Sequence, residues 1–193
     1  MPKCIVIADD LTGANATGVL LKKEGFDSLT LLRESVAKSA SLPDCDCLIT
    51  PTDSRAIPSE EAYERVASTL KLLKAPEVLH YAKRIDSTLR GNLGSETDAF
   101  LDVLGGEYMA VCVPCFPSSG RIIVGGHLLV NGVPLRKTEA AHDPKCPIHT
   151  TNAAELLRSQ SRYPTAAVPL DVVHDGAERL GRVLRELRAQ GIR

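Results

Sequence analysis

Short apolar runs alternate with longer amphipathic segments along roughly the first half of the chain. The apolar runs have the length and the Ile, Val and Leu content of buried strands, and they cover 3–8, 28–32, 47–50, 78–82 and 108–113. Between them, apolar residues recur every three or four positions, which predicts helices at 14–24, 60–73 and 95–104. Alternating strands and helices are typical of a parallel sheet covered by helices. The pattern therefore predicts an α/β fold: a three-layer, Rossmann-like, mostly parallel sheet with helices on both faces.

The pattern changes in the second half of the chain. Two short apolar runs, 127–130 and 133–135, flank Asn131-Gly132, a two-residue turn in which both positions need positive φ. We therefore expect a β-hairpin appended to the sheet. Asn152 and Glu155 form a capping-box pattern that opens a short helix, and 166–169 is a candidate edge strand. A last helix carries an apolar stripe, which consists of Leu180, Val183, Leu184 and Leu187.

The length of 193 residues suits one domain around one core. The 23 basic and 24 acidic residues leave a net charge of −1, which argues against nonspecific nucleic-acid binding. No apolar stretch reaches the roughly 20 residues of a membrane span, and the N-terminus has no signal-peptide pattern, so we expect a cytoplasmic protein with no membrane partner. The last helix leads into 191–193 as if another strand followed. We expect residues 1–193 to form a single domain that is cut from a longer protein, with a natural C-terminus after the last helix as the alternative.

The six cysteines are expected to be reduced, because most lie in apolar runs, where a thiol packs as a small hydrophobic group. Two closely spaced pairs, Cys45 with Cys47 and Cys112 with Cys115, leave a structural zinc site open as an alternative. Against this alternative, the second pair lies in an apolar run that is typical of the end of a buried strand. A redox pair is disfavoured as well, since nothing in the sequence predicts a stabilised thiolate there.

Polar residues gather directly after four of the predicted strands, where ligands bind in open α/β sheets. These segments are 9–13, 52–55, 83–92 and 118–121, the last of which is followed by 125–127. Their arginines and lysine suit a carboxylate or phosphate, whereas their aspartates suit hydroxyl groups or a divalent cation. A small polyhydroxylated acid would satisfy both sets.

Each of these segments also has a structural explanation. Asp9 or Thr12 suits the N-cap of the first helix, and Arg55 suits a turn with a surface ion pair. His127 beside a hairpin is as compatible with packing as with chemistry. The segment 83–92 is hardest to explain in this way, because seven of its ten residues are polar or charged and Gly91 permits close backbone approach.

Common nucleotide-binding and hydrolase motifs are absent from the sequence. It contains no Gly-x-x-x-x-Gly-Lys-Ser/Thr phosphate loop, no Gly-x-Gly-x-x-Gly after a strand, no Gly-x-Ser-x-Gly elbow and no His-Glu-x-x-His pair. The residues that would bind a nucleotide cofactor are therefore unknown from the sequence.

Taken in order, the polar motifs resemble the N-terminal domain of the four-carbon acid sugar kinase family. They comprise Ile7-Ala-Asp-Asp-Leu-Thr-Gly-Ala14, Thr52-Asp-Ser-Arg55, Lys83 with Ile85-Asp-Ser-Thr-Leu-Arg-Gly-Asn92, Pro114 with Phe116-Pro117, Gly120-Arg121, Gly125-Gly-His127, Val130-Asn-Gly-Val-Pro-Leu135, Thr138-Glu139, Asp143-Pro144 and Pro147. Each motif is weak alone, but their order and spacing over about residues 3–160 make the resemblance specific. The sequence departs from the family at Asn15, where an acidic residue is usual, and at 149–151.

The resemblance implies an enzyme that uses ATP and Mg²⁺ to phosphorylate threonate, erythronate or 3-oxo-tetronate. It also implies that this domain binds the sugar acid, whereas a C-terminal domain absent from this chain binds most of the nucleotide and metal. We therefore expect the chain alone to be inactive. Its expected partners are the sugar acid and that C-terminal domain, with a homodimer as a further option.

Strand-end position and family resemblance together define the candidate site. Asp9 and Asp10 are the candidate catalytic residues, because a carboxylate can orient the attacking hydroxyl group and accept its proton. The candidate substrate-binding residues are Thr12, Asp53, Ser54, Arg55, Lys83, Asp86, Ser87, Thr88, Arg90, Asn92, Arg121 and His127. Arg55, Lys83 or Arg90 is expected to bind the substrate carboxylate and Asp86 a hydroxyl group, and no residue is assigned to a metal ion. The alternative is a sugar-acid-binding module without catalysis.

Overall fold

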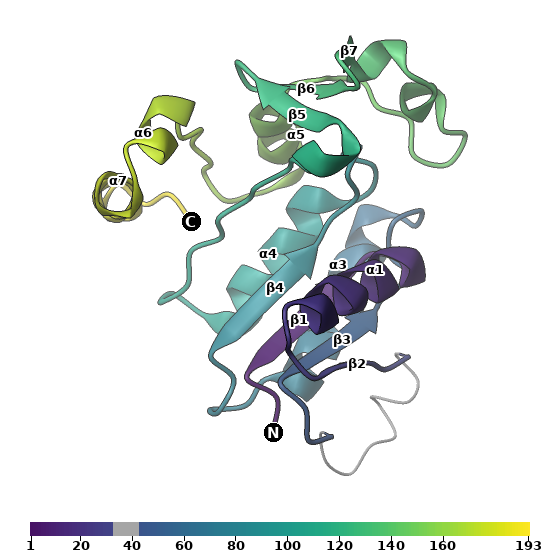
Figure 1. Ribbon diagram of the computed structural model, residues 1–193, viewed down its shortest axis with the longest axis vertical. Coiled ribbons are helices and arrows are strands. Elements are labelled where there is room, and N and C mark those ends of the chain that lie inside the picture. The colour runs from purple at the N-terminus through teal and green to yellow at the C-terminus, as the bar shows by residue number, and fades with distance from the viewer. Residues whose placement is uncertain (33–42) are drawn as a thin grey trace.

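The computed structural model describes residues 1–32 and 43–193, which form a parallel sheet below and an antiparallel sheet above in the view of Figure 1. In chain order, the helices and strands are β1 (Cys4–Ala8), α1 (Leu11–Lys23), β2 (Ser28–Thr30), β3 (Cys47–Pro51), α3 (Ser59–Leu73), β4 (His80–Arg84), α4 (Leu93–Leu104), β5 (Arg121–Val124), β6 (His127–Val130), β7 (Val133–Pro134), α5 (Ala153–Gln160), α6 (Leu170–His174) and α7 (Ala177–Ala189). Short 3-10 turns lie at Pro117–Ser119, Leu135–Lys137 and Glu139–His142.

The parallel sheet has the strand order β2-β3-β1-β4. β1 is central and pairs in parallel with β3 on one side and with β4 on the other. Ala8 lies beside both Pro51 and Arg84, so these three strands end at the same level. Because the chain leaves all three strands at one edge, the register brings the segments that follow them close together.

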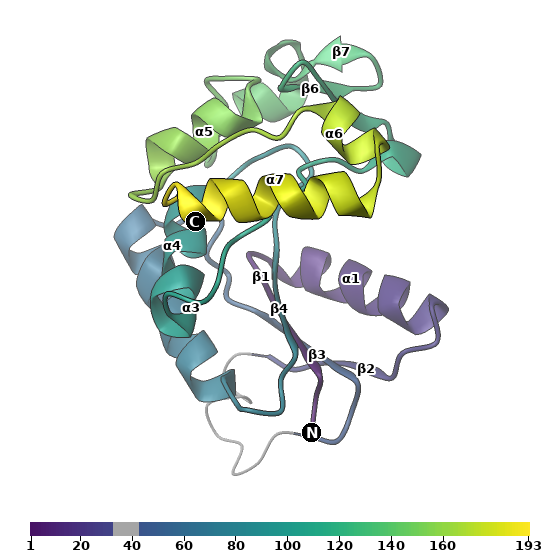
Figure 2. The ribbon, with the colours of Figure 1, turned by 90° about the vertical axis from the view of Figure 1, so that its left-hand side faces the viewer.

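Alternate residues of the parallel strands face opposite helical layers. Ile7 belongs to a buried cluster with Val66 of α3 and Phe100 of α4, whereas Ala8 belongs to a cluster with Ala14 of α1. Figure 2 shows the resulting layers, with α1 on one side of the sheet and α3 and α4 on the other. Each large apolar side chain buried in this way contributes roughly 1.5–3 kcal/mol to stability. The prediction of a three-layer α/β fold with helices on both faces is confirmed.

Helix α1 begins earlier than predicted because Asp10 caps it. The Asp10 carboxylate accepts a hydrogen bond from the backbone N–H of Gly13 at 2.7 Å. The expected caps, Asp9 and Thr12, lie one residue before this position and inside the first turn, respectively. That expectation is therefore wrong, and the capping residue is itself one of the candidate catalytic carboxylates.

The antiparallel sheet and α5 form a second layer of structure over the carboxyl edge of the parallel sheet (Figure 1). The predicted hairpin is confirmed, since β6 and β7 flank Asn131 and Gly132, both of which have positive φ. This part has its own buried cluster, which includes Leu89, Leu128 and Leu135. Helix α5 crosses α4 so closely that a Cβ on Gly94 would lie 2.5 Å from the backbone of Gln160.

The predicted fifth parallel strand at 108–113 does not form. Its side chains are largely exposed, with Val111 and Val113 at 60% and 69%. The backbone turns on itself instead of pairing with β4: Tyr108 donates to the Gly105 carbonyl and Cys115 to the Val113 carbonyl. β4 also starts and ends two residues later than predicted, because its backbone pairs with β1 over His80–Arg84.

Two further differences concern the second half of the chain. The segment 166–169 is not a strand, because Pro169 instead precedes helix α6. Strand β5 was not predicted, although Gly125 and Gly126 turn it directly into β6 with positive φ at both positions. Across the described ranges 1–32 and 43–193, no helix is both long and apolar enough to cross a membrane.

Candidate functional site

Arg55 is the centre of the polar cluster at the carboxyl edge of the parallel sheet. Its guanidinium group forms two parallel hydrogen bonds with Asp9, Nε to Oδ2 at 2.7 Å and Nη2 to Oδ1 at 3.0 Å. A third nitrogen lies 2.6 Å from Asp10 Oδ2, and Nη2 is 3.8 Å from Asp86 Oδ1. One arginine from the segment after β3 therefore joins carboxylates that follow β1 and β4. We call Asp9, Asp10, Arg55, Asp86 and Arg90 the strand-end cluster.

These ion pairs keep Arg55 charged. Burial would lower the pKa of its guanidinium group, but the hydrogen bonds and charge of Asp9, together with the charges of Asp86 and Asp10, raise that pKa above its usual value. The Asp9 side chain is almost fully buried, at 4% exposure, whereas the Asp10 side chain is 28% exposed. Within the cluster, Asp10 therefore presents more of its carboxylate to solvent than Asp9.

The Asp86 carboxylate is enclosed by its own loop. It accepts hydrogen bonds from the backbone N–H and hydroxyl of Thr88 and two from the Arg90 guanidinium group, Nε to Oδ2 at 2.9 Å and Nη2 to Oδ1 at 3.1 Å. Burial would raise the pKa of Asp86, but the hydrogen bonds from Arg90 and Thr88 and the charge of Arg55 hold it well below its usual range. Asp86 is thus ionised and rigidly held at neutral pH.

Arg90 extends the cluster toward the upper part of the molecule. Its Nη1 donates to Asp143 Oδ2 at 2.8 Å, across 53 positions of sequence. The other Asp143 oxygen accepts from the backbone N–H groups of Lys145 and Cys146, and these bonds and Arg90 lower the pKa of Asp143. Asp143 was not among the predicted site residues, although its Asp-Pro motif carried part of the family resemblance.

The backbone is strained at two positions of this site. Asp53 and Leu89 have φ of 50° and 61°, in the left-handed region that L-residues with a Cβ rarely adopt. Leu89 keeps this conformation while its side chain is 1% exposed, so burial in the upper cluster holds the Asp86–Arg90 turn in place. Such strain is common where a protein fixes side chains for binding or chemistry.

Gly91 lets the two loops of the cluster approach each other. It has φ of 96°, and a Cβ there would lie 3.2 Å from the Arg55 carbonyl oxygen. Asn92 joins the same loops through its side-chain amide, which donates to the Ser54 and Ile57 carbonyls at 2.9 Å each. The predicted residues Ser54 and Asn92 therefore help to hold the site together in this structure.

Lys83 lies apart from the open face of the cluster. The later start of β4 places it inside the strand, so its expected position after the strand is wrong. Its side chain faces α4, where the ammonium nitrogen lies 2.5 Å from Glu96 Oε2, and it also donates to the Arg84 carbonyl. This pair is almost fully buried.

The neighbouring Arg84 is not among the predicted site residues, although it also lies at the end of β4. Side chains of a strand alternate between faces, so Arg84 faces α1 while Lys83 faces α4. Its Cγ lies 3.5 Å from the position of a Cβ on Gly13, beside the Asp10 cap. The sequence signal was present, since Arg84 lies inside the dense polar segment 83–92.

The remaining predicted residues occupy several places. Thr12 and Asp53 are exposed near the cluster, Ser87 is half-buried, and Thr88 is buried against Asp86. Arg121 and His127 lie instead on β5 and β6, where Arg121 donates to the Ser119 carbonyl and His127 Nδ1 is 2.7 Å from the Thr151 hydroxyl. The structure thus brings together the residues after β1, β3 and β4, and places these two on the antiparallel sheet.

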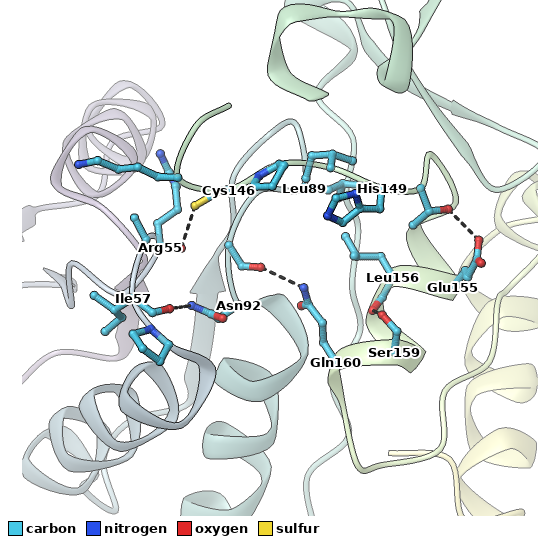
Figure 3. A pocket seen from close by; sticks show the side chains of 17 residues that line it. Arg55, Ile57, Leu89, Asn92, Cys146, His149, Glu155, Leu156, Ser159 and Gln160 are labelled. Carbon is cyan, nitrogen blue, oxygen red and sulfur yellow. Dashed lines mark hydrogen bonds between the residues drawn. The ribbon is translucent and has the colours of Figure 1, made fainter. Parts of the chain in front are cut away.

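A cavity of about 660 Å³ lies behind Arg55, between the segment after β3, the loop at 145–150 and helix α5. Figure 3 shows Cys146 pointing toward Arg55, whose carbonyl oxygen is 3.2 Å from the sulfur, and Gln160 reaching across the cavity wall toward the Gly91 carbonyl. Of the strand-end cluster, only Arg55 lines this cavity. The partly exposed carboxylate of Asp10 and the cavity are therefore two separate places where a small molecule could be bound.

The described part of the chain contains no group of side chains suited to hold a metal ion. No three His, Cys, Asp or Glu side chains of residues 1–32 and 43–193 are grouped so that they could hold a metal ion. Asp9, Asp10 and Asp86 are already paired with arginines, which compete with a cation for their oxygens. In the alternative zinc set, Cys45 is buried whereas Cys112 is exposed. These cysteines are therefore not grouped as a metal site among the described residues.

The fold and the cluster define a class of protein: an α/β domain with polar side chains gathered beyond the carboxyl ends of its strands, where domains of this class bind small ligands. A family model described as a sugar-binding N-terminal domain matches residues 4–193. The chain belongs to this family.

Curated relatives are similar to this chain over nearly its whole length, which agrees with its place in this family. The chain is 45% identical over 193 residues to a D-erythronate kinase of Heliobacterium modesticaldum, covering 100% of this chain and 44% of the relative. It is 40% identical to a D-threonate kinase of Salmonella typhimurium, over 98% of this chain and 44% of the relative. A Haemophilus influenzae crystal structure superposes with a TM-score of 0.89 at 31% identity, over 98% of this chain and 46% of that one. The chain thus spans less than half the length of these proteins.

Proposed function

We propose that this chain is the sugar-acid-binding part of an ATP-dependent kinase that phosphorylates a hydroxyl group of a four-carbon sugar acid, such as erythronate, threonate or 3-oxo-tetronate. The observation that carries the proposal is the strand-end cluster, in which one arginine joins the carboxylates of Asp9, Asp10 and Asp86 at the carboxyl edge of the sheet. Hydroxyl groups of a sugar acid are suitable donors to such carboxylates. The kinase relatives at 45% and 40% identity support the substrate class.

Within this site, Asp10 is the residue we assign to the reacting hydroxyl group. It is the more exposed member of the Asp9–Asp10 pair, and Arg55 together with the Gly13 N–H fixes its orientation. A carboxylate held in this way can orient the attacking hydroxyl and accept its proton as the phosphoryl group is transferred. The buried Asp9 acts through Arg55, as a positioning residue.

We assign Asp86 and the residues around it to binding the other hydroxyl groups of the sugar acid. Ser87, Thr12 and Asp53 offer hydroxyl and carboxylate oxygens on the exposed side of the cluster. Arg90 keeps Asp86 ionised and ties the site to Asp143 in the upper part of the molecule. Because Asp86 and Arg90 are each held by several bonds, this part of the site is preformed before the substrate binds.

ATP and Mg²⁺ are proposed to bind mainly to parts of the kinase outside residues 1–193. The chain has no phosphate loop in its sequence and no grouped metal ligands in its described residues. We therefore assign no step of the reaction on this domain to the nucleotide or the metal. A C-terminal domain of a longer protein would bring them to Asp10 and exclude water from the site. Such an ATP-dependent metabolic enzyme would act in the cytoplasm.

Calorimetric titration of the chain with D-erythronate, D-threonate and magnesium–ATP tests this division. We expect a tetronate to bind and magnesium–ATP to give no measurable heat, because the ligands for the nucleotide are outside the chain. Arg90→Ala should weaken tetronate binding, since it removes two of the hydrogen bonds that orient the Asp86 carboxylate. Binding of magnesium–ATP without any tetronate would contradict the proposal. Turnover of the complete protein distinguishes a kinase from a sugar-acid-binding module without catalysis.

A further inference from the structure

The strand-end cluster has more negative than positive charge. Asp9, Asp10 and Asp86 share Arg55 and Arg90, and Arg90 also pairs with a further carboxylate, that of Asp143. Four carboxylates thus face two guanidinium groups. A substrate that carries its own carboxylate is repelled by this surplus unless a further cation receives it.

The cations first expected to bind the substrate carboxylate are already engaged. Arg55 and Arg90 use most of their N–H groups on aspartates of the cluster. Lys83 is buried against Glu96 on the opposite face of the sheet. A substrate carboxylate would have to displace a short internal ion pair to reach any of the three, and that exchange gains little.

Arg84 differs from these three residues because no carboxylate of the described residues pairs with it. Its guanidinium group makes one hydrogen bond, from Nη1 to the adjacent Ile85 carbonyl at 2.9 Å, and no described carboxylate lies within ion-pair distance of it. It is half-buried at the end of β4, directly beside Ala8 of β1. Most of its five N–H donors therefore remain free for a ligand.

The position of Arg84 suits a short ligand that also reaches Asp10. Gly13 separates the two side chains: a Cβ on Gly13 would lie 2.8 Å from Asp10 Oδ1 and 3.5 Å from Arg84 Cγ. A carboxylate and a hydroxyl group a few bonds apart on one small molecule fit two groups spaced in this way. We propose that Arg84 binds the carboxylate of the sugar acid and so selects acids over neutral sugars. This inference rests on the proposed function.

The test compares D-erythronate with erythritol, which keeps the four-carbon chain and its hydroxyl groups but lacks the carboxylate. In Arg84→Gln, we expect D-erythronate to bind about 10- to 100-fold more weakly, the loss of a hydrogen-bonded charge pair, with little change for erythritol. Arg84→Lys should restore part of the affinity. Arg158→Gln, which removes an exposed arginine of α5, should leave both affinities unchanged.

Three outcomes separate the inference from the proposed function. If the wild-type chain binds D-erythronate and Arg84→Gln binds it equally well, the inference is wrong and the proposed function stands. If Arg121→Gln or Lys145→Gln loses the acid while Arg84→Gln keeps it, the carboxylate is bound elsewhere and the inference is again wrong. If the wild-type chain binds no four-carbon acid at all, the proposed function itself fails. Thermal unfolding of each variant verifies that the fold is retained.

Discussion

Replacing Arg55 by alanine is expected to lower the free energy of unfolding by about 3–5 kcal/mol, because it leaves buried carboxylates without their shared counter-charge. Arg55 is 19% exposed, and Asp9, its partner in two hydrogen bonds, is 4% exposed. Removing one partner of a buried ion pair costs far more than removing a surface pair. Urea titration at neutral pH measures the effect. The chain should also lose D-erythronate binding, since Asp10 is no longer held.

Two comparisons make this prediction specific. Arg188→Ala breaks an exposed pair with Glu107 and should change stability by less than about 1 kcal/mol. Adding Asp9→Asn to Arg55→Ala should recover part of the lost free energy of unfolding, because the buried charge of Asp9 that Arg55 no longer compensates is then removed. If Arg55→Ala costs no more than Arg188→Ala, Arg55 does not hold the cluster together.

Asp86→Asn is expected to destabilise the chain by about 3 kcal/mol at neutral pH and to weaken the dependence of stability on acid. The pKa of Asp86 is held well below the usual aspartate value of about 4 in the folded chain. A carboxylate whose pKa is lower in the folded chain stabilises the fold fully at pH values above its usual pKa. This contribution is lost as the pH falls through the folded-state pKa. The wild-type chain should therefore lose stability below about pH 4, and Asp86→Asn should lose less over the same range.

Urea titrations at a series of pH values between neutral and strongly acidic measure this difference. Asp27→Asn is the matched control, because the Asp27 carboxylate is 63% exposed and its one ion pair among the described residues is with the exposed Lys22. Its pH dependence should parallel that of the wild type. Parallel curves for Asp86→Asn and the wild type would show that the contacts with Arg90, Thr88 and Arg55 do not lower the pKa of Asp86.

The sequence was most informative about which segments meet. Strand periodicity placed β1 and β3 within one residue of their ends, and the rule that parallel strands end at one edge brought Asp10, Arg55 and Asp86 together. The apolar run at 108–113 shows the limit of the same reasoning. Apolar content indicates that a segment suits a strand, but it does not show whether a neighbouring strand is there to receive its hydrogen bonds.

The site was harder to predict than the fold because ion pairing depends on register. A shift of β4 by two residues moves Lys83 and Arg84 from a loop into the strand, where they face opposite sides of the sheet. The sequence therefore could not show that Lys83 is paired internally and that Arg84 is free of a described carboxylate. The contact between Arg90 and Asp143 joins residues 53 positions apart and depends on the packing of the upper part of the molecule.

We expect a four-carbon sugar acid to bind at the strand-end cluster and not in the cavity behind Arg55. Two-dimensional amide NMR spectra of the chain, recorded while D-erythronate is added, test it directly. Binding at the cluster should give the largest shifts at the amides of Asp10, Thr12, Gly13 and Asp86, which surround the exposed face of the cluster. Shifts confined to the cavity residues Lys145, His149 and Ser159, with none at residues 9–13, would contradict it.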